Sequence, residues 1–519
     1  MKSTKWIIGW FILVITVLLG IGCFVYKIDP YFHYHKPDTK TYFYSLDNQR
    51  SQNDGISKHF EYDALITGTS MTENFKTSEM DEVFHVNSIK VAYSGGTYKE
   101  INDNLSVALK SNVKLKTVIR SLDYNLLIMD KDAMRSDLGK YPTYLYDHNL
   151  FNDVYYLFNK DVIFSRAYEM TEETKREGFE PGITSFDLYS RWQQWYTCGR
   201  KNVIPEGIHM GLTTESIHLN DEEKAIVHGN ITQNVTLLAD TYPEVDFYYF
   251  FTPYSAAWWA DLKNEGTIYR QIEAEEYAIE LILKHENIKL FSFNNRTDIT
   301  TDLNNYRDSV HYAEWINSLM LKAMHNGEYQ ITYDNYKEYL QRELEFYTKF
   351  NYNSLDEQED YEADYYAAAL LNEEITGTKP IQLLDESKED IDALDKIVIS
   401  RGGLPEEQSN RTILYEQLVD NKYNCLEIRI DNISNYKYLC FKGKKVSDNG
   451  QPVVLIYNDK GEFLMEYTKS YLDLDNEWHQ YLIDLNNLGE AVVIIFSGGY
   501  IDGSEVNVPE CQFSDIALY

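Results

Sequence analysis

The chain has 519 residues and a formal net charge of −34 at pH 7. This length exceeds what one ordinary hydrophobic core serves, so we expect two or more domains. The acidic balance, with no long block of Lys or Arg, excludes the basic face that a nucleic-acid-binding protein needs and suits a domain that faces the extracytoplasmic medium.

The first predicted element is an apolar segment, Trp6 to Tyr26, about as long as a helix that crosses a bilayer. Lys2 and Lys5 precede it, so the positive-inside rule places the N-terminus in the cytoplasm and the remainder of the chain outside. A cleaved signal peptide is the alternative, but the segment is long and no small-residue cleavage pattern follows it. We expect residues 1–28 to be a single-pass membrane anchor.

Strands and helices alternate in the next part of the chain, after an aromatic and polar lead segment at residues 29–60. The predicted strands are Ala64–Thr67, Val86–Tyr93, Leu115–Leu122, Val245–Phe251 and Ile288–Phe293. The predicted helices are Thr77–Phe84, Thr97–Lys110, Asp221–Asp240 and Thr267–His285. Such alternation predicts an α/β domain with a mostly parallel, three-layer α/β/α sheet, spanning residues 29–330.

A long insertion, residues 126–218, separates the third and fourth predicted strands. It contains Trp192, Trp195 and Tyr196. Loops at this edge of an α/β sheet commonly shape pockets, so a lid over a site is one interpretation. The other is that these aromatic side chains only fasten the insertion to the domain.

The remaining chain divides into a connector and a β-rich domain. Residues 331–384 hold an amphipathic helix candidate, 332–349, and the acidic stretch Asp356–Asp364, which is typical of a solvated face. From residue 385 the predicted strands are Leu426–Ile430, Tyr438–Gly443, Val453–Tyr457, Glu462–Thr468, Trp478–Asp484 and Val492–Ser497. Asn458–Gly461 is a hairpin turn signal. Residues 385–519 are therefore predicted to form an antiparallel β-sandwich.

Two short segments carry the candidate chemistry. Ser70 follows the first predicted strand, at the edge where open α/β sheets place their ligands. Asp308 and His311 stand three residues apart, just before an amphipathic helix. Singly, each has an ordinary structural explanation, as a helix cap or a packed histidine. Together a hydroxyl, a carboxylate and an imidazole are the groups that activate a serine, and their combination in this order favours catalysis.

At these residues the chain resembles the SGNH (GDSL-like) hydrolase superfamily. That family has its nucleophile in a G-x-S segment, here Gly68 to Ser70, and a late D-x-x-H motif, here Asp308 to His311. The resemblance covers roughly residues 60–325. It implies that Ser70 is the nucleophile, His311 the base and Asp308 the residue that orients the base. It implies no cofactor and no metal.

The resemblance also implies an oxyanion hole. Its candidate backbone donors are the N–H groups of Ser70 and of Gly95, with Gly96 as the second choice for the glycine. The family's G-x-N-D block is absent, and Ser121–Asn125 appears at its position. The third donor is therefore either Asn125 or missing.

Among proteins of this type, the chain resembles membrane-anchored proteins of teichoic-acid D-alanine transfer and alginate O-acetylation. The resemblance implies an extracytoplasmic serine O-acyltransferase or acylesterase. Its substrate would be a cell-surface glycan, and its partner a multi-span membrane-bound O-acyltransferase. The β-sandwich looks like a carbohydrate-binding module, with a ligand-free assembly domain as the alternative. The competing function is a catalytically degenerate glycan-binding or assembly protein, favoured by the absent G-x-N-D block. Scattered cysteines and histidines give no metal-ligand spacing.

Overall fold

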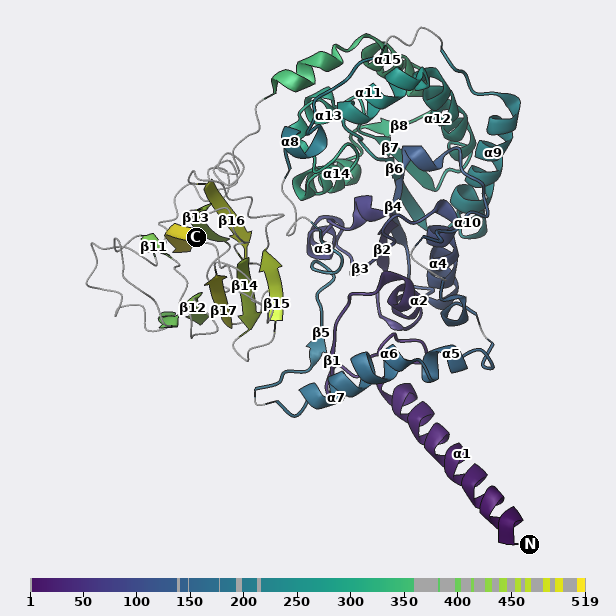
Figure 1. Ribbon diagram of the computed structural model, residues 1–519. Helices are drawn as coiled ribbons and strands as arrows, with labels where there is room; N and C mark the ends of the chain where they lie inside the picture. The colour runs from purple at the N-terminus through teal and green to yellow at the C-terminus, as the bar shows by residue number, and fades with distance from the viewer. Residues whose placement is uncertain are drawn as a thin grey trace. The chain divides into compact units, whose positions relative to one another are not determined.

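Figure 1 shows the computed structural model of the chain. It describes residues 2–137, 141–147, 149–176, 178–192, 198–211 and 216–358, and beyond residue 358 essentially the strands β9–β18. The chain forms two compact units. The first comprises Met1–Arg191 and Val203–Gln358, and the second comprises Trp192–Asn202 and Glu359–Tyr519. Each is described by itself.

The N-terminal helix α1 (Lys2–Ile28) is apolar over Thr4–Ile28, with a mean hydropathy of 2.6. Within the part of the chain that the structure describes, it is the one helix long and apolar enough to cross a bilayer, a test that a signal sequence also passes. Its last turns enter the first unit, where Val25 and Ile28 are buried. The predicted apolar helix is therefore present.

A six-stranded sheet forms the centre of the first unit. Its strands are β2 (Ala64–Gly68), β3 (Ser88–Ala92), β4 (Thr117–Leu122), β6 (Asp246–Phe251), β7 (Ile288–Ser292) and β8 (Gln330–Ile331). They lie in the order β3-β2-β4-β6-β7-β8, and all neighbours are parallel except β7 and β8. The predicted mixed α/β fold with a mainly parallel sheet is confirmed. The strand order reverses between β2 and β4, the position where such sheets bind ligands.

Helices α2 to α4 and α9 to α15 pack around this sheet. They are α2 (Gln49–His59), α3 (Thr77–Phe84), α4 (Tyr98–Ser111), α9 (Asp221–Ile231), α10 (Leu237–Thr241), α11 (Ala256–Glu265), α12 (Ile268–Ile282), α13 (Thr297–Thr300), α14 (Glu314–Asn326) and α15 (Tyr336–Lys349). Helix α3 contacts α14, α2 contacts α4, and α12 contacts both α9 and α15. Thr97 and Glu100 form a capping box that begins α4. The predicted helix Asp221–Asp240 is interrupted by a π-helical stretch, Thr232–Thr236.

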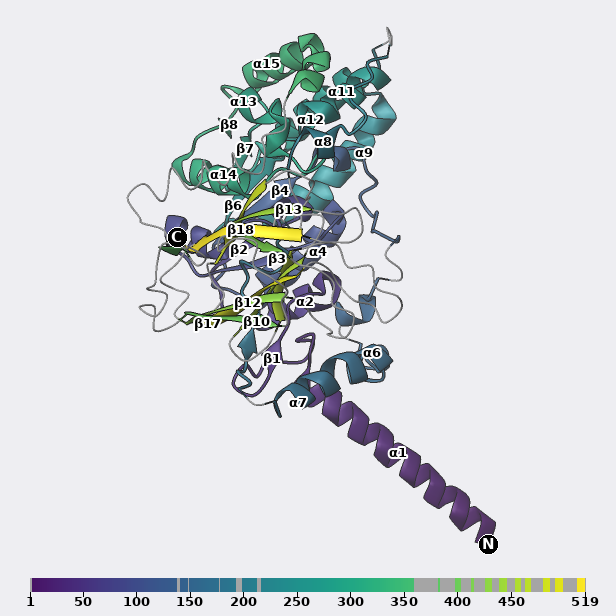
Figure 2. The same ribbon diagram turned by 60° about the vertical axis from the view of Figure 1, so that its left-hand side comes forward.

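The insertion contributes short helices and a short strand. They include α5 (Val154–Leu157), α6 (Lys160–Val162), the π-helical η4 (Ile163–Tyr168), α7 (Glu169–Glu173), β5 (Gly182–Ile183) and α8 (Arg200–Val203). Strand β5 pairs in parallel with β1 (Phe43–Tyr44), so the insertion is joined to the segment that follows α1. In both views α6 and α7 lie beside the end of α1 (Figures 1 and 2), and Figure 1 shows α5 next to α6. Trp192 is buried, whereas Trp195 and Tyr196 lie outside the described residues.

The second unit contains antiparallel strands. They are β9 (Ile381–Gln382), β10 (Ile397–Gly402), β11 (Thr412–Leu414), β12 (Cys425–Asp431), β13 (Tyr438–Lys445), β14 (Val453–Asn458), β15 (Phe463–Tyr467), β16 (His479–Asp484), β17 (Ala491–Ser497) and β18 (Cys511–Leu518). One sheet has the order β10-β12-β17-β14-β15, and the other β11-β18-β13-β16 with β9 on β18. Strands β14 and β15 pair as the hairpin signal predicts.

Candidate active site

Ser70 lies immediately beyond the carboxyl end of the buried strand β2. Gly68 ends this strand with a φ of +151°, and a Cβ there would come within 2.3 Å of the Ser121 hydroxyl. Glycine is therefore needed for the chain to leave the sheet so close to β4. Ser70 then begins a short 3₁₀ turn, Ser70–Thr72, and is half-buried.

The three sequence-predicted residues of the triad meet at this point. The Oγ of Ser70 is 2.8 Å from Nε2 of His311, a residue 241 positions farther along the chain. The Nδ1 of His311 is 2.7 Å from Oδ2 of Asp308 and 2.9 Å from Oδ1. Hydroxyl, imidazole and carboxylate thus form one continuous chain of hydrogen-bonding groups, the arrangement that activates a serine.

The loop that carries Asp308 and His311 is held by its own backbone and by a neighbouring loop. Tyr306 pairs with Tyr312 as an isolated antiparallel bridge that closes the loop. The carbonyl of Ser309 accepts hydrogen bonds from both the backbone N–H (3.1 Å) and the hydroxyl (2.8 Å) of Ser255, which follows β6. The Tyr312 hydroxyl donates to the carbonyl of Met71, directly after the serine (3.2 Å). His311 is therefore positioned from two sides.

Charge at the site favours an ionised Asp308. Burial raises the pKa of the Asp308 carboxyl, but hydrogen bonds from the ring and backbone of His311, together with the imidazole's charge, outweigh it and hold this pKa below its usual value. The His311 and Asp308 side chains remain 23% and 39% exposed, so the triad is open to solvent. A carboxylate so placed can stabilise an imidazolium that forms when an imidazole takes a proton from a neighbouring hydroxyl.

The candidate oxyanion donors differ in whether their N–H groups already donate a hydrogen bond within the protein. The N–H of Gly96 is donated to the carbonyl of Tyr93 at 2.7 Å, so it is occupied. For Gly95, no acceptor of its N–H is recorded among the described residues, and its φ is +56°. Asn125 is exposed, and its Oδ1 accepts from the Tyr254 hydroxyl at 3.2 Å, which leaves its amide group as the donor end. Gly95 and Asn125 thus suit a donor role better than Gly96.

Buried Asp123 links the serine turn to Asn125. Its carboxylate accepts from the Thr69 hydroxyl at 2.8 Å and from the Ser121 hydroxyl at 3.1 Å. It also accepts from the Tyr254 hydroxyl at 3.1 Å, the same hydroxyl that contacts Asn125. Burial raises the pKa of Asp123, and these three hydrogen bonds oppose that shift. Asp123 lies in Ser121–Asn125, the segment that stands where the family's G-x-N-D block is absent, whereas the sequence gave no signal for Tyr254.

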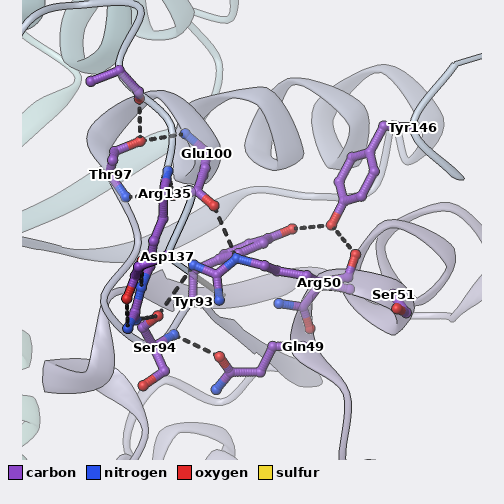
Figure 3. Close-up of polar contacts among 12 residues, drawn as sticks. Gln49, Arg50, Ser51, Tyr93, Ser94, Thr97, Glu100, Arg135, Asp137 and Tyr146 are labelled. Atoms are coloured by element: carbon purple, nitrogen blue, oxygen red, sulfur yellow. Dashed lines mark hydrogen bonds and ion pairs between the residues drawn. The ribbon is translucent and has the colours of Figure 1, made fainter. Parts of the chain in front are cut away.

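Figure 3 shows the contacts that hold Ser94, the residue before Gly95. The carbonyl of Ser94 accepts from Nη1 of Arg135 at 2.8 Å and from Nη2 of Arg50 at 3.2 Å. The N–H of Ser94 donates to Oε1 of Gln49 at 2.6 Å. A Cβ on Gly95 would come within 1.9 Å of the Arg135 guanidinium. Gln49 and Arg50 belong to α2 and Arg135 to the insertion, so no local pattern in the sequence links them to the Gly95 turn.

A buried lysine donates hydrogen bonds to the segment that follows the Ser70–Thr72 turn. Lys90, in the middle of β3, donates from Nζ to the carbonyls of Glu73 at 2.5 Å and of Phe75 at 2.9 Å. Burial lowers the pKa of Lys90 to about 7. The described residues contain no group of three or more His, Cys, Asp or Glu side chains placed to hold a metal ion.

No protein-family model and no curated protein matches the chain. Among solved structures, the secreted serine protease VesC from Vibrio cholerae is 14% identical with a TM-score of 0.19, covering 27% of this chain and only 28% of that one. A putative platelet activating factor from Streptococcus pneumonia is 12% identical with a TM-score of 0.25, covering 56% and 91%. A family 11 carbohydrate-binding module from Clostridium thermocellum is 12% identical with a TM-score of 0.16, covering 27% and 94%. At such TM-scores these likenesses carry no argument about function.

Proposed function

We propose that the chain is an SGNH-type serine O-acyltransferase or acylesterase that acts outside the cytoplasm on a cell-surface glycan. The observation that carries this proposal is the hydrogen-bonded series Ser70 Oγ, His311 Nε2 and Asp308, with contacts of 2.8 Å and 2.7 Å. It lies at the carboxyl ends of parallel strands, beside the reversal of strand order, where α/β enzymes act.

The chemistry proceeds in two half-reactions that share one base. Ser70 Oγ attacks the acyl carbon while His311 Nε2 takes its proton, and the same proton passes to the departing oxygen as the old ester bond breaks. The acyl group is then an ester of Ser70. In the second half, a sugar hydroxyl or water gives its proton to His311 and attacks that ester, and Ser70 regains its proton.

Developing negative charge on the acyl oxygen needs fixed donors. The N–H groups of Ser70 and Gly95 and the amide of Asn125 are the proposed donors, each worth about 2.7–4 kcal/mol in comparable sites. The hydrogen bonds from Arg50 and Arg135 to Ser94 hold the Gly95 turn before the substrate arrives. Preorganisation of this kind avoids a reorganisation cost during the reaction.

The location of the site and its substrate class belong to the same proposal. Helix α1 is proposed to remain as a single-pass anchor, with the bulk of the chain outside. The antiparallel sheets of the second unit are proposed to form a β-sandwich of the carbohydrate-binding type. A multi-span membrane-bound O-acyltransferase is the proposed source of the acyl group, as in the systems that the sequence resembles.

A serine-directed fluorophosphonate and an activated acetyl ester test the proposal. The unchanged protein is expected to form one adduct at Ser70 and to release acetate, and Ser70→Ala is expected to lose both. Ser111→Ala, an exposed serine at the end of α4, is the matched control and retains both. A protein that gives no adduct and no acetate is a glycan-binding or assembly protein instead.

A further inference from the structure

Large apolar side chains that are exposed gather in one stretch of the insertion. Among the residues that the structure describes outside α1, twelve large hydrophobic side chains are exposed, and seven of them lie between residues 150 and 168. These seven are Leu150, Phe151, Val154, Tyr155, Phe158, Phe164 and Tyr168, and we call them the 150–168 face. Phe151 is 91% exposed and Leu150 77%. Exposed apolar residues gathered in this way mark contact with a partner or a membrane.

The buried side of the same segment is fastened to the end of α1. Buried Tyr156 donates its hydroxyl to Oδ1 of Asp29 at 2.8 Å and accepts from the N–H of Tyr31 at 3.1 Å. Val162 and Val25, the latter in α1, share one small hydrophobic cluster with Tyr31 and Tyr156. Elements α5 and η4 both contact α1. The 150–168 face is thus held in place beside this helix.

The position along α1 at which the 150–168 segment makes contact indicates what the exposed face touches. A hydrocarbon layer about 30 Å thick takes about 20 helical residues, so a span that begins at Trp6 leaves the layer near Val25. The ring of Phe158 lies 3.8 Å from where a Cβ on Gly22 would be, just before that point. The face therefore begins where α1 passes from acyl chains to headgroups.

We propose that the 150–168 face lies in the headgroup layer of the phospholipid leaflet from which α1 emerges. The inference rests on the membrane anchoring proposed above. Phe and Leu side chains of the face enter the acyl boundary, and Tyr155 and Tyr168 remain among the headgroups, where aromatic residues are enriched. Interfacial segments of this kind bury their apolar face by about 5–10 Å. A single helix alone would leave the domain free to tilt relative to the bilayer plane, and this second attachment restricts that tilt.

Photo-crosslinking of the full-length protein in phosphatidylcholine nanodiscs tests the inference. The nanodiscs contain a phospholipid with a diazirine in the headgroup-proximal part of one acyl chain, and adducts are located by peptide mass spectrometry. Adducts are expected on α1 and on residues 150–168. Tyr329 and Tyr333, exposed aromatic residues that flank β8, are expected to carry none.

The outcomes separate the two proposals. Adducts on α1 without adducts on residues 150–168 overturn the interfacial face and leave the anchor in place. A lack of adducts on α1 overturns the anchor and the face together. The double variant Phe151→Asp, Tyr155→Asp changes only exposed side chains, so folding is retained, and it is expected to lose the adducts on 150–168 while keeping those on α1. Val113→Asp, at a site that is 87% exposed, is the matched control and keeps both. Unchanged adducts in the double variant also overturn the inference.

Discussion

Asp308 holds both the backbone and the ring of His311. Its Oδ1 accepts the backbone N–H of His311 at 2.8 Å, and its two oxygens lie 2.9 Å and 2.7 Å from the ring Nδ1. The same carboxylate accepts the N–H of Val310 at 3.0 Å. One side chain therefore shapes the loop and fixes the tautomer in which Nε2 faces Ser70.

Asp308→Asn is expected to separate these two roles. The Asn oxygen still accepts the backbone N–H of His311, so the free energy of unfolding changes by about 1 kcal/mol. The amide can no longer stabilise an imidazolium, and kcat on an activated ester is expected to fall by about 10³–10⁴-fold. Asp302→Asn, at the start of the nearby turn Leu303–Asn305, is the control and retains kcat. A kcat for Asp308→Asn within a few-fold of the unchanged protein would contradict a catalytic triad.

Gly95→Ala is expected to remove activity through the backbone. An L side chain in the left-handed region costs about 1–2 kcal/mol, and here its Cβ also meets the Arg135 guanidinium. The turn must shift and carry its N–H away from the reacting oxygen. Gly327→Ala is matched in strain, with a φ of +72°, but lies at the end of α14. Calorimetry should show a loss of stability in both variants, whereas the ester assay should show loss of activity in Gly95→Ala alone.

Asn125→Ala tests whether a third oxyanion donor exists. If the amide of Asn125 donates to the developing oxyanion, kcat is expected to fall by about 10²–10³-fold with KM little changed. Tyr254→Phe leaves the amide present but releases its oxygen, so a smaller loss of kcat is expected. Steady-state kinetics of both variants decide the matter. Full activity in Asn125→Ala would show that two backbone donors suffice.

A buried carboxyl pair predicts pH-dependent stability. Glu275, on α12, accepts from the Tyr124 hydroxyl at 2.9 Å, and Glu343, on α15, accepts from Asn294 at 2.6 Å. Both are fully buried. Burial raises the pKa of Glu343 to about 7, and burial together with the charge of Glu343 raises the pKa of Glu275. The stability that depends on their protonated form is present below pH 4.5 and is lost as pH rises through 7.

Glu343→Gln removes this titration while keeping an acceptor for Asn294. The free energy of unfolding of the variant, minus that of the unchanged protein, is expected to rise by up to about 3 kcal/mol from pH 5 to pH 8. Denaturant unfolding of both proteins at the two pH values measures this difference. Other titrating groups, such as Lys90, contribute equally to both proteins and cancel. Glu345→Gln, exposed on the same helix, should run parallel to the unchanged protein. A parallel course for Glu343→Gln as well would contradict the raised pKa.

The parallel strands could be predicted from the sequence because they are covered on both faces. Such strands appear as short, nearly continuous apolar runs, and β2, β6 and β7 all follow this pattern. The capping box at Thr97 likewise marks the true start of α4. The grouping of Ser70, Asp308 and His311, whose side chains the structure brings together, could be predicted because their spacing and order are visible in the sequence itself.

Other elements left no readable pattern. Helix α2 buries four polar side chains, Gln52, Asn53, Asp54 and Ser57, and among its large apolar side chains only Ile56, so it escapes a search for apolar periodicity. Those side chains find partners that only the fold supplies, such as the carbonyl of Ala92 for Asn53. Strand β8 has two residues, too few for any alternation. The support of the Gly95 turn by Arg50 and Arg135 joins distant segments, which no local window can reveal.

The bonds from Ser255 to the carbonyl of Ser309 bear on how relatives of this chain would be found. Because the acceptor is main-chain, any residue at position 309 can provide it, and the loop can change its side chain without moving the histidine. In a distant homologue, the residues between Asp308 and His311 could therefore differ while the same geometry is retained. A search for such homologues should give more weight to Asp308, His311 and the turn that begins at Ser70 than to the residues between Asp308 and His311.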